Sequence, residues 1–309
     1  MIKKNFDLTR HNTFRISAKA QYFVMVKNQD ELVAALNWTK EKKLRVHILA
    51  GGSNVLMAVK IIKGLVIKIS GEEYSVKGST ITAWAGTGLT KLAKIAEAHS
   101  LTGLEWAYGI PGQLGGAVRG DTGAYGSSIS RVVEYVEAYD YKKSKFVSLN
   151  NRACKFSYKH SVFVDKKNLL VISVKLKLTA GNKAEIKKLA AANFSHRSLT
   201  KPKAPSAGSV FKNLSYAEVA KANKSLAIEL AGKSMVKGGK IPAAYLIDQA
   251  NLKGKTRGGA KVSEKHANFI INFNNAKAED IIGLINLIKI RIKNKFKINL
   301  IEEIQYFGK

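Results

Sequence analysis

The segment that most constrains the fold runs from Gly103 to Gly126, GLEWAYGIPGQLGGAVRGDTGAYG, and holds eight of the chain's 25 glycines. Glycine weakens helix and strand interiors because it loses the most backbone entropy on folding, so the segment is expected to be mainly loop. Apolar and aromatic side chains alternate with the glycines, which is not the composition of a solvated linker. We therefore expect the main chain of this segment to lie close to a large flat or anionic ligand. The alternative is a tight turn packed against another element.

Length and composition indicate a folded globular chain of two or three domains. It has 309 residues, of which 46% are hydrophobic and 24% are charged. No run reaches the roughly 18 apolar residues of a membrane span. The first residues, MIKKNFDLTRHNTFRIS, lack the apolar core of a signal peptide. A cytoplasmic protein without a membrane partner is therefore expected.

The net charge of +30 first suggests a nucleic-acid partner. The basic residues are scattered, however, and their clusters lack the interleaved aromatic residues that stack on single strands. We therefore expect the charge to attract anionic small molecules and expect no nucleic-acid partner; a basic RNA-binding protein stays as an alternative. The single cysteine, Cys154, excludes an internal disulfide and a cysteine-based metal cluster, and no metal is expected. Its surroundings give no reason for a reactive thiolate.

The first seventy residues are typical of a small α/β unit. A helix is predicted over Gln29–Lys43, with strands at Val46–Ala50 and Leu65–Ile69. The turn between the strands, Gly51-Gly52-Ser53-Asn54, offers unhindered N–H groups and a hydroxyl suited to a pyrophosphate. It is not the G-x-G-x-x-G fingerprint, so a Rossmann nicotinamide fold is disfavoured.

The remainder of the chain mixes strands and helices, which makes the fold class α+β. The middle region is strand-rich and the last third mainly helical, with a boundary near Pro202 and Pro205. Strands are predicted at Ile81–Ala85, Arg131–Asp140, Phe146–Leu149, Leu170–Leu178 and the closing INLIEEIQYFGK. Helices are predicted at Thr90–His99, Ala184–Phe194, Ala217–Ala231, from Pro242 onward, and at Asp280–Arg291.

Six motifs in order carry a family resemblance. They are NTFRI (12–16), LAGGSN (49–54), GLEWAYGIPGQLGGAV with GAYG, FSYKHSVF (156–163), AGSVFKN (207–213) and GGAKVSEKHANFIIN (258–272). Together they make the chain resemble the UDP-N-acetylenolpyruvoylglucosamine reductases, also called UDP-N-acetylmuramate dehydrogenases. FSYKHSVF passes directly into the later strands, which resembles the shorter class of that family.

The resemblance implies a two-part FAD-binding fold of the vanillyl-alcohol-oxidase-like type and a C-terminal α+β substrate domain. The implied domains are 1–70 (FAD-binding subdomain 1), 71–195 (FAD-binding subdomain 2) and 196–309 (UDP-sugar binding). The implied FAD-binding residues are Gly51, Gly52, Ser53, Asn54, Gly109, Ile110, Pro111, Gly112, Gly115, Gly116, Gly123, Ala124 and Tyr125. Glycine in both loops agrees with this, because an isoalloxazine ring needs close main-chain approach.

The implied activity belongs to peptidoglycan precursor synthesis, within cell-wall biogenesis. By the resemblance, NADPH is a co-substrate that reduces the bound FAD. The enolpyruvyl ether of UDP-N-acetylglucosamine then takes a hydride at C3 and a proton at C2, giving UDP-N-acetylmuramate. A monomer is expected.

Three positions match the family's catalytic set. Ser209 would donate the proton to C2, and Glu303 would pair with a cation at the substrate carboxylate; Glu302 stays open as the alternative to Glu303. Where the family has Tyr-Arg-x-Ser, this chain has Tyr158-Lys159-His160-Ser161. Lysine keeps the charge but lacks the bidentate fork of arginine. The expectation is that Lys159 retains the polarising role.

Three further residues are expected to bind substrate by the same resemblance: Tyr158, Arg197 and Asn213. Arg197 is a plausible diphosphate ligand because a guanidinium can bridge phosphate oxygens. His266 lies in a matching motif and is assigned a structural role. A flavoprotein oxidase on another substrate remains the second alternative function, and AGSVFKN and VSEKHANF argue against it.

Overall fold

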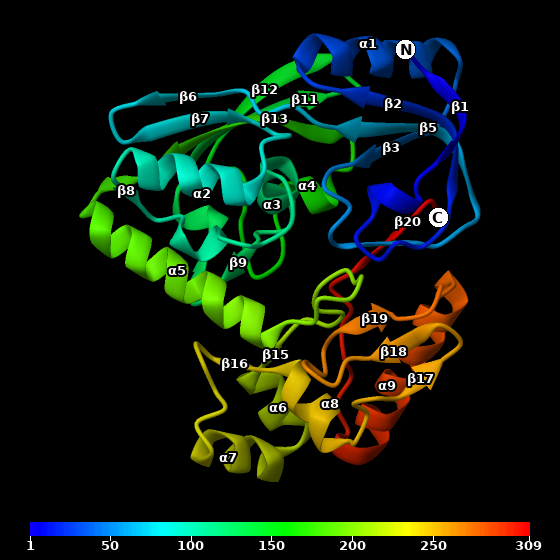
Figure 1. Cartoon of the computed structure of the whole chain (residues 1–309), viewed down its shortest axis with the longest axis vertical. Helices are drawn as coiled ribbons and strands as arrows, with labels where there is room; N and C mark the ends of the chain where they lie inside the picture. Colours follow the sequence, from blue (N-terminus) through cyan, green and yellow to red (C-terminus); the bar gives the residue numbers. More distant parts are fainter. The chain divides into compact units, whose positions relative to one another are not determined.

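The computed structural model describes residues 1–309 and divides the chain into two compact units (Figure 1). Unit 1 comprises Met1–Phe6, Ala20–Gly51 and Ile62–Leu199, and unit 2 comprises Asp7–Lys19, Gly52–Ile61 and Thr200–Lys309. The chain therefore enters unit 2 twice before its C-terminal third. No helix is long and apolar enough to cross a membrane.

A four-stranded sheet in order β1-β2-β5-β3 forms the first part of unit 1. Its strands are β1 (Lys3–Asp7), β2 (Lys19–Val26), β5 (Ile61–Ile69) and β3 (Val46–Leu49). β3 and β5 run parallel, with Val46 opposite Leu65. Helix α1 (Gln29–Glu41) begins at Asn28, whose side chain accepts from Glu31 N at 2.9 Å. The predicted helix and both predicted strands are confirmed.

One hydrophobic cluster joins α1 to this sheet. It contains Leu32 and Leu36 of α1 with Leu65, Ile67 and Ile69 of β5, all buried. Burying such side chains is worth about 1.5–3 kcal/mol each before the entropy cost of ordering the chain. The alternation along β5 leaves Val66 and Lys68 on the opposite face of the strand.

A five-stranded antiparallel sheet, in order β12-β11-β13-β7-β6, forms the second part of unit 1 (Figure 1). Its strands are β12 (Lys145–Asn150), β11 (Val133–Asp140), β13 (Leu169–Lys177), β7 (Thr80–Trp84) and β6 (Tyr74–Lys77). A separate cluster packs α2 (Leu89–Ala98) and α3 (Leu114–Arg119) on it through residues such as Leu92, Leu114 and Val174. The predicted strands of the middle region are confirmed.

Helix α3 lies inside the glycine-rich segment, which was expected to be mainly loop. The expectation was wrong for Leu114–Arg119, since this short helix contains Gly115 and Gly116. A Cβ on Gly115 would lie 2.9 Å from the Cβ of Ala85, so the glycine serves close helix packing. Short elements complete unit 1: β8 (Leu101–Thr102), η2 (Glu105–Ala107), β9 (Gly123–Ala124), β10 (Ser127–Ser128), η3 (Ile129–Arg131), α4 (Val162–Asp165), β14 (Thr179–Ala180) and α5 (Lys183–Thr200).

Unit 2 contains short strands and four helices. Helix α9 (Ala278–Phe296) buries Ile281, Leu284, Ile285 and Ile288 on one face and contacts β17 and β18. The other elements are η1 (Thr9–His11), β4 (Val55–Met57), β15 (Leu214–Ser215), α6 (Tyr216–Ala222), α7 (Lys224–Gly232), β16 (Lys240–Ile241), α8 (Ala243–Gln249), β17 (Thr256–Arg257), β18 (Ala260–Val262), β19 (Ile270–Asn272) and β20 (Gln305–Phe307). β4 and β20 pair in parallel, and β17-β18-β19 form one sheet.

Two predicted elements of unit 2 were wrong. The single helix predicted over Ala217–Ala231 is two helices, because Asn223 leaves helical geometry and its side chain accepts from Leu226 N at 3.1 Å. Asparagine is a strong helix N-cap, so it starts α7 where α6 ends. The closing strand is confined to Gln305–Phe307, and Glu302 makes only an isolated bridge with Phe211.

The predicted division into 1–70, 71–195 and 196–309 stays a prediction. Two separate hydrophobic clusters in unit 1, one around β5 and α1 and one around α2 and the antiparallel sheet, support two subdomains there. The fold class α+β is confirmed by the mixture of strands and helices.

Candidate active site

The predicted pyrophosphate turn follows β3 directly. Gly52 has φ +66°, and a Cβ there would clash with the carbonyl oxygen of His11. Only glycine fits this position, because both the conformation and the space exclude a side chain. The Gly52 carbonyl accepts from Thr13 N at 3.0 Å, so the NTFRI motif holds the turn.

Asn12 of the same motif is a buried clamp that the sequence reasoning did not assign. Its side chain is 2% exposed and donates to the carbonyl oxygens of Leu8 and Ile16, both at 3.0 Å. Its Oδ1 accepts from Ile16 N at 3.0 Å. A buried asparagine with all these bonds fixes the loop that carries Thr13.

Gly51, from the first of the two loops predicted to bind the cofactor, lies beside Gly112 of the second loop within unit 1. A Cβ on Gly51 would lie 3.0 Å from the Cα of Gly112, and a Cβ on Gly116 would lie 3.6 Å from the Cβ of Ala50. Beside them, Gln113 Oε1 is buried without a hydrogen-bond partner. Bare main chain and an unsatisfied buried acceptor fit a group such as FAD, which needs close backbone approach.

Gly123, Ala124 and Tyr125 form a small hairpin. Gly123 pairs with Ser128 and Ala124 with Ser127, while Tyr125 takes φ +54° at the turn. The Tyr125 hydroxyl donates to the carbonyl of Asn193 at 3.0 Å, which ties the hairpin to α5.

Helix α5 also covers Gly109. A Cβ on Gly109 would lie 2.7 Å from Phe194 Cδ2 and 3.4 Å from Arg197 Cδ. Arg197 is therefore beside the glycine-rich loop, as a cofactor or substrate ligand must be. Burial lowers the pKa of its guanidinium, and Tyr125 partly offsets this.

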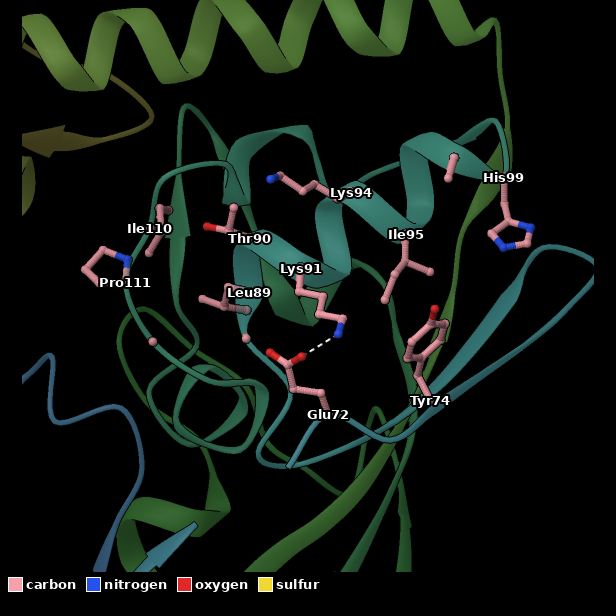
Figure 2. Close-up of a pocket in the computed structure, with 13 residues that line it drawn as sticks. Glu72, Tyr74, Leu89, Thr90, Lys91, Lys94, Ile95, His99, Ile110 and Pro111 are labelled. Carbon is pink, nitrogen blue, oxygen red and sulfur yellow. Dashed lines mark hydrogen bonds and ion pairs between the residues drawn. The ribbon is translucent and has the colours of Figure 1, made fainter. Parts of the chain in front are cut away.

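A cavity of about 630 Å³ borders the same loop (Figure 2). Ile110, Pro111 and Gly112 form one edge, and an ion pair between Lys91 and Glu72 lies on its wall. Its remaining lining comes from α2 and its N-cap residue Gly88 and from Tyr74: Gly88, Leu89, Thr90, Lys94, Ile95, Ala98 and His99. Of this lining, the sequence predicted only Ile110, Pro111 and Gly112 as cofactor-binding residues. The position of the flavin ring stays a prediction.

Tyr158 and Lys159 occupy the tip of a two-residue turn in unit 1. Ser157 and His160 exchange backbone hydrogen bonds at 3.1 and 2.9 Å, and Lys159 has φ +57°. A left-handed lysine costs about 1 kcal/mol, and such strain occurs often at functional sites. The Ser161 hydroxyl, fully buried, donates to the Arg119 carbonyl at 2.7 Å and so anchors the turn to the end of α3.

Ser209 and Glu303 lie on neighbouring extended segments of unit 2. Ser209 forms an isolated bridge with Phe269, and Glu303 N donates to the carbonyl of Val210 at 2.8 Å. The Asn54 side chain donates to the Glu303 carbonyl at 3.2 Å. The structure thus brings together three predicted site residues, Asn54, Ser209 and Glu303.

Asn268 holds the Ser209 segment and was missed by the sequence reasoning. It is 3% exposed, accepts from Phe211 N at 2.9 Å and donates to the Phe211 carbonyl at 2.8 Å. Its own carbonyl accepts from Val210 N at 2.8 Å. The VSEKHANF motif therefore acts partly by fixing main chain next to Ser209. The sequence alone did not show this role, because it depends on the contacts of the buried Asn268 side chain.

The Glu302 carboxylate is already occupied by structural hydrogen bonds. It accepts from Lys289 Nζ at 2.9 Å and from the Tyr306 hydroxyl at 2.6 Å. This supports Glu303 over Glu302 as the functional carboxylate. Asn213 is exposed, and its Oδ1 accepts from Ala243 N, at the start of α8, at 3.3 Å.

Two titratable residues have structural surroundings, as expected. Cys154 is fully buried, and burial raises the pKa of its thiol to about 11. His266 packs edge-on against Phe269 with ring centroids 4.8 Å apart. Burial, followed by the charge of Lys201, lowers the pKa of His266 to about 4.

Comparison with known proteins gives consistent matches over the whole chain. Residues 200–307 match the family described as UDP-N-acetylenolpyruvoylglucosamine reductase, C-terminal domain, and residues 20–150 match an FAD binding domain family. A UDP-N-acetylenolpyruvoylglucosamine reductase of Caldanaerobacter subterraneus is 38% identical, covering 98% of this chain and 93% of that protein. One from Prochlorococcus marinus is 34% identical, covering 99% and 98%. The crystal structure of the Thermus caldophilus UDP-N-acetylenolpyruvylglucosamine reductase superposes with a TM-score of 0.79 at 28% identity, covering 99% of both chains.

The depressed pKa of His266 predicts a pH-dependent stability. Between pH 6.5 and about 4 the unfolded chain binds a proton at this histidine and the folded chain does not, so stability falls as pH falls through this window. The limit is about 1.4 kcal/mol per pH unit. Replacing His266 by phenylalanine keeps the ring contact and should reduce that fall by about 1–2 kcal/mol in urea unfolding followed by circular dichroism.

The control is His99→Asn, which removes an exposed histidine from α2's C-terminal end. It should leave the pH profile unchanged. If the wild type and His266→Phe lose the same stability as the pH falls, His266 is not the source of the pH dependence.

Proposed function

The chain belongs to the UDP-N-acetylenolpyruvoylglucosamine reductases, FAD-containing oxidoreductases of peptidoglycan precursor synthesis, and from this premise we propose the course of its reaction. NADPH is the reductant, and the enolpyruvyl ether of UDP-N-acetylglucosamine is reduced to UDP-N-acetylmuramate. When bound, FAD carries the hydride from NADPH to C3 of the enol ether. The observation that supports this most is the joint position of Asn54, Ser209 and Glu303 in unit 2.

Ser209 is proposed to donate the proton to C2. Adding a hydride at C3 moves negative charge toward C2 and the attached carboxylate, and a positioned hydroxyl can end that charge by protonating carbon. The Ser209 main chain is paired with Phe269, and its neighbour Val210 is held by both Asn268 and Glu303. A hydroxyl on so constrained a strand has little freedom to leave its position.

Lys159 and Glu303 are proposed to act on the substrate carboxylate. Lysine at the tip of its turn would stabilise the developing negative charge, as a point charge without bidentate geometry. Glu303 would pair with a cation there. Hydrogen bonds to Val210 and Asn54 fix the Glu303 backbone, so only its side chain can adjust to the ligand.

Tyr158, Arg197 and Asn213 are proposed to contact the UDP-sugar. Tyr158 is 38% exposed beside Lys159, and Arg197 lies next to Gly109. Arg197 is suited to the diphosphate because a guanidinium binds two phosphate oxygens at once. The exposed Asn213 follows Ser209 on the same segment.

The two half-reactions test the function directly. Under anaerobic conditions NADPH should bleach the flavin absorbance of the purified protein. Adding the enolpyruvyl nucleotide should restore the colour with formation of UDP-N-acetylmuramate. Reoxidation by oxygen alone, with no response to the nucleotide, would instead favour a flavoprotein oxidase; a colourless protein that binds RNA with steep salt dependence would favour the RNA-binding alternative.

Ser209→Ala separates the two half-reactions. Flavin bleaching by NADPH should proceed at the wild-type rate, because no proton donor to carbon is needed there. Recovery of colour should slow by about 10²–10⁴-fold, the usual contribution of a general acid. Ser206→Ala, three residues away in the same segment, is the matched control. Normal recovery in Ser209→Ala would remove Ser209 from this role.

Lys159 is tested with arginine and methionine variants. Lys159→Met should slow the second half-reaction by at least about tenfold, since the charge is lost, and Lys159→Arg should retain it. The measurement is stopped-flow recovery of flavin absorbance at saturating nucleotide. Lys155→Met, an exposed lysine of the same segment, is the control. An unaffected Lys159→Met protein would exclude Lys159 from catalysis.

A further inference from the structure

Lys68 is a half-buried cation next to the predicted pyrophosphate turn. It lies opposite Leu49 in the parallel β3–β5 pair, and its ammonium donates to the carbonyl oxygen of Ala50, the residue before Gly51. Its neighbours Ile67 and Ile69 point to the hydrophobic cluster of α1, so Lys68 extends from the other face of β5.

The ammonium of Lys68 has no carboxylate partner. Its one hydrogen bond goes to a neutral carbonyl, and burial lowers the pKa of the lysine to about 8. Even partial burial of a cation without a counter-charge is unfavourable, because its desolvation is not offset by an ion pair. Such a group indicates that an anion belongs beside it in the working protein.

Polar groups and bare main chain lie close to Lys68. Gln113 donates from Nε2 to the Ile69 carbonyl at 3.2 Å, which brings it to the end of β5, while its Oε1 is buried and unsatisfied. Gly51 and Gly112 meet at the same place, main chain to main chain. A cation, an unused acceptor and two residues without side chains therefore converge where β3 and β5 end.

We propose that Lys68 binds the diphosphate of FAD and that Gln113 Oε1 accepts from a hydroxyl of the same cofactor. The ammonium matches a phosphate oxygen, whereas an amide oxygen is only an acceptor and requires a donor such as a sugar hydroxyl. This deepens the proposed function by naming which side chains hold its cofactor. Neither residue was predicted from the sequence.

The test compares flavins that differ in phosphate content. Flavin is stripped from the purified protein, and dissociation constants for FAD and riboflavin are measured by flavin fluorescence. In Lys68→Met, FAD affinity should fall by about 10- to 100-fold, as expected for loss of one charge-assisted bond, with riboflavin affinity unchanged within about twofold. Lys63→Met, an exposed lysine on the same strand, should bind both flavins like the wild type.

Stability separates a cofactor ligand from a structural tether. If Lys68 serves the cofactor, flavin-free Lys68→Met should unfold at the same or a higher temperature than flavin-free wild type, because a partly buried charge without a counter-charge is removed. FAD should then raise the melting temperature of the variant less than that of the wild type. A lower melting temperature without flavin, or failure to fold, would assign Lys68 to holding the Ala50 carbonyl and overturn the proposal.

Two further results would contradict the proposal. Equal losses of FAD and riboflavin affinity would mean that the loop, not a phosphate contact, was disturbed. Unchanged FAD affinity with weaker binding of UDP-N-acetylglucosamine to the flavin-loaded variant would move the contact to the substrate diphosphate. Wild-type protein that binds FAD through Lys68 yet fails to reduce the enolpyruvyl nucleotide would refute the proposed function alone.

Discussion

Close approach of main chain to main chain at Gly51 and Gly112 is the constraint on which the cofactor region depends. The strand end at Ala50 and the glycine-rich loop approach closely here, since a Cβ on Gly51 would lie only 3.0 Å from the Cα of Gly112. Gly116 keeps the same side of α3 bare toward Ala50. A Cβ at Gly51 would require the two segments to move apart by a few tenths of an ångström, whereas a Cβ at Gly116 would make ordinary contact with Ala50. The ordinary packing of α2 and α3 on the antiparallel sheet fixes one of these segments, and the parallel β3–β5 pair fixes the other.

In unit 2, hydrogen bonds fix the segment that carries Ser209, the proposed proton donor. The Ser209 side chain is short, so in the proposed role the position of its hydroxyl depends on the position of the backbone. Asn268 uses both its side chain and its carbonyl on Val210 and Phe211, and the Glu303 amide binds the same strand from the other side. Four hydrogen bonds of about 1 kcal/mol each, three from Asn268 and one from the Glu303 amide, confine this segment more effectively than any single contact could. The Asn54 amide then links this arrangement to the turn after β3 through the Glu303 carbonyl.

Local signals in the sequence were sufficient for most of the elements and for the two glycine loops. Hydrophobic periodicity predicted α1, α2, β11 and β13, because each buries one face against a continuous core. Periodicity did not show the break at Asn223, since a cap depends on one side chain and not on a repeat. The helix around Gly115 was missed because glycine is needed there for close packing against Ala85, thirty residues earlier in the chain. A local pattern does not show such a contact. Lys68, Asn12 and Asn268 could not be assigned, because their roles come from partners that only the fold supplies.

If Lys159 acts on the substrate carboxylate as proposed, the backbone can compensate for its weaker side chain. An arginine fixes a carboxylate through its planar fork, whereas an ammonium on a flexible stem fixes only the charge. Here the stem begins at a left-handed residue in a two-residue turn, whose ends are joined by two backbone hydrogen bonds and by the bond of Ser161 to Arg119. Left-handed strain of about 1 kcal/mol is tolerated only because these bonds determine the turn. The direction in which the side chain leaves the turn is thereby set before any ligand arrives. In the proposed role of Lys159, this turn would supply part of the orientation that an arginine supplies through its planar fork.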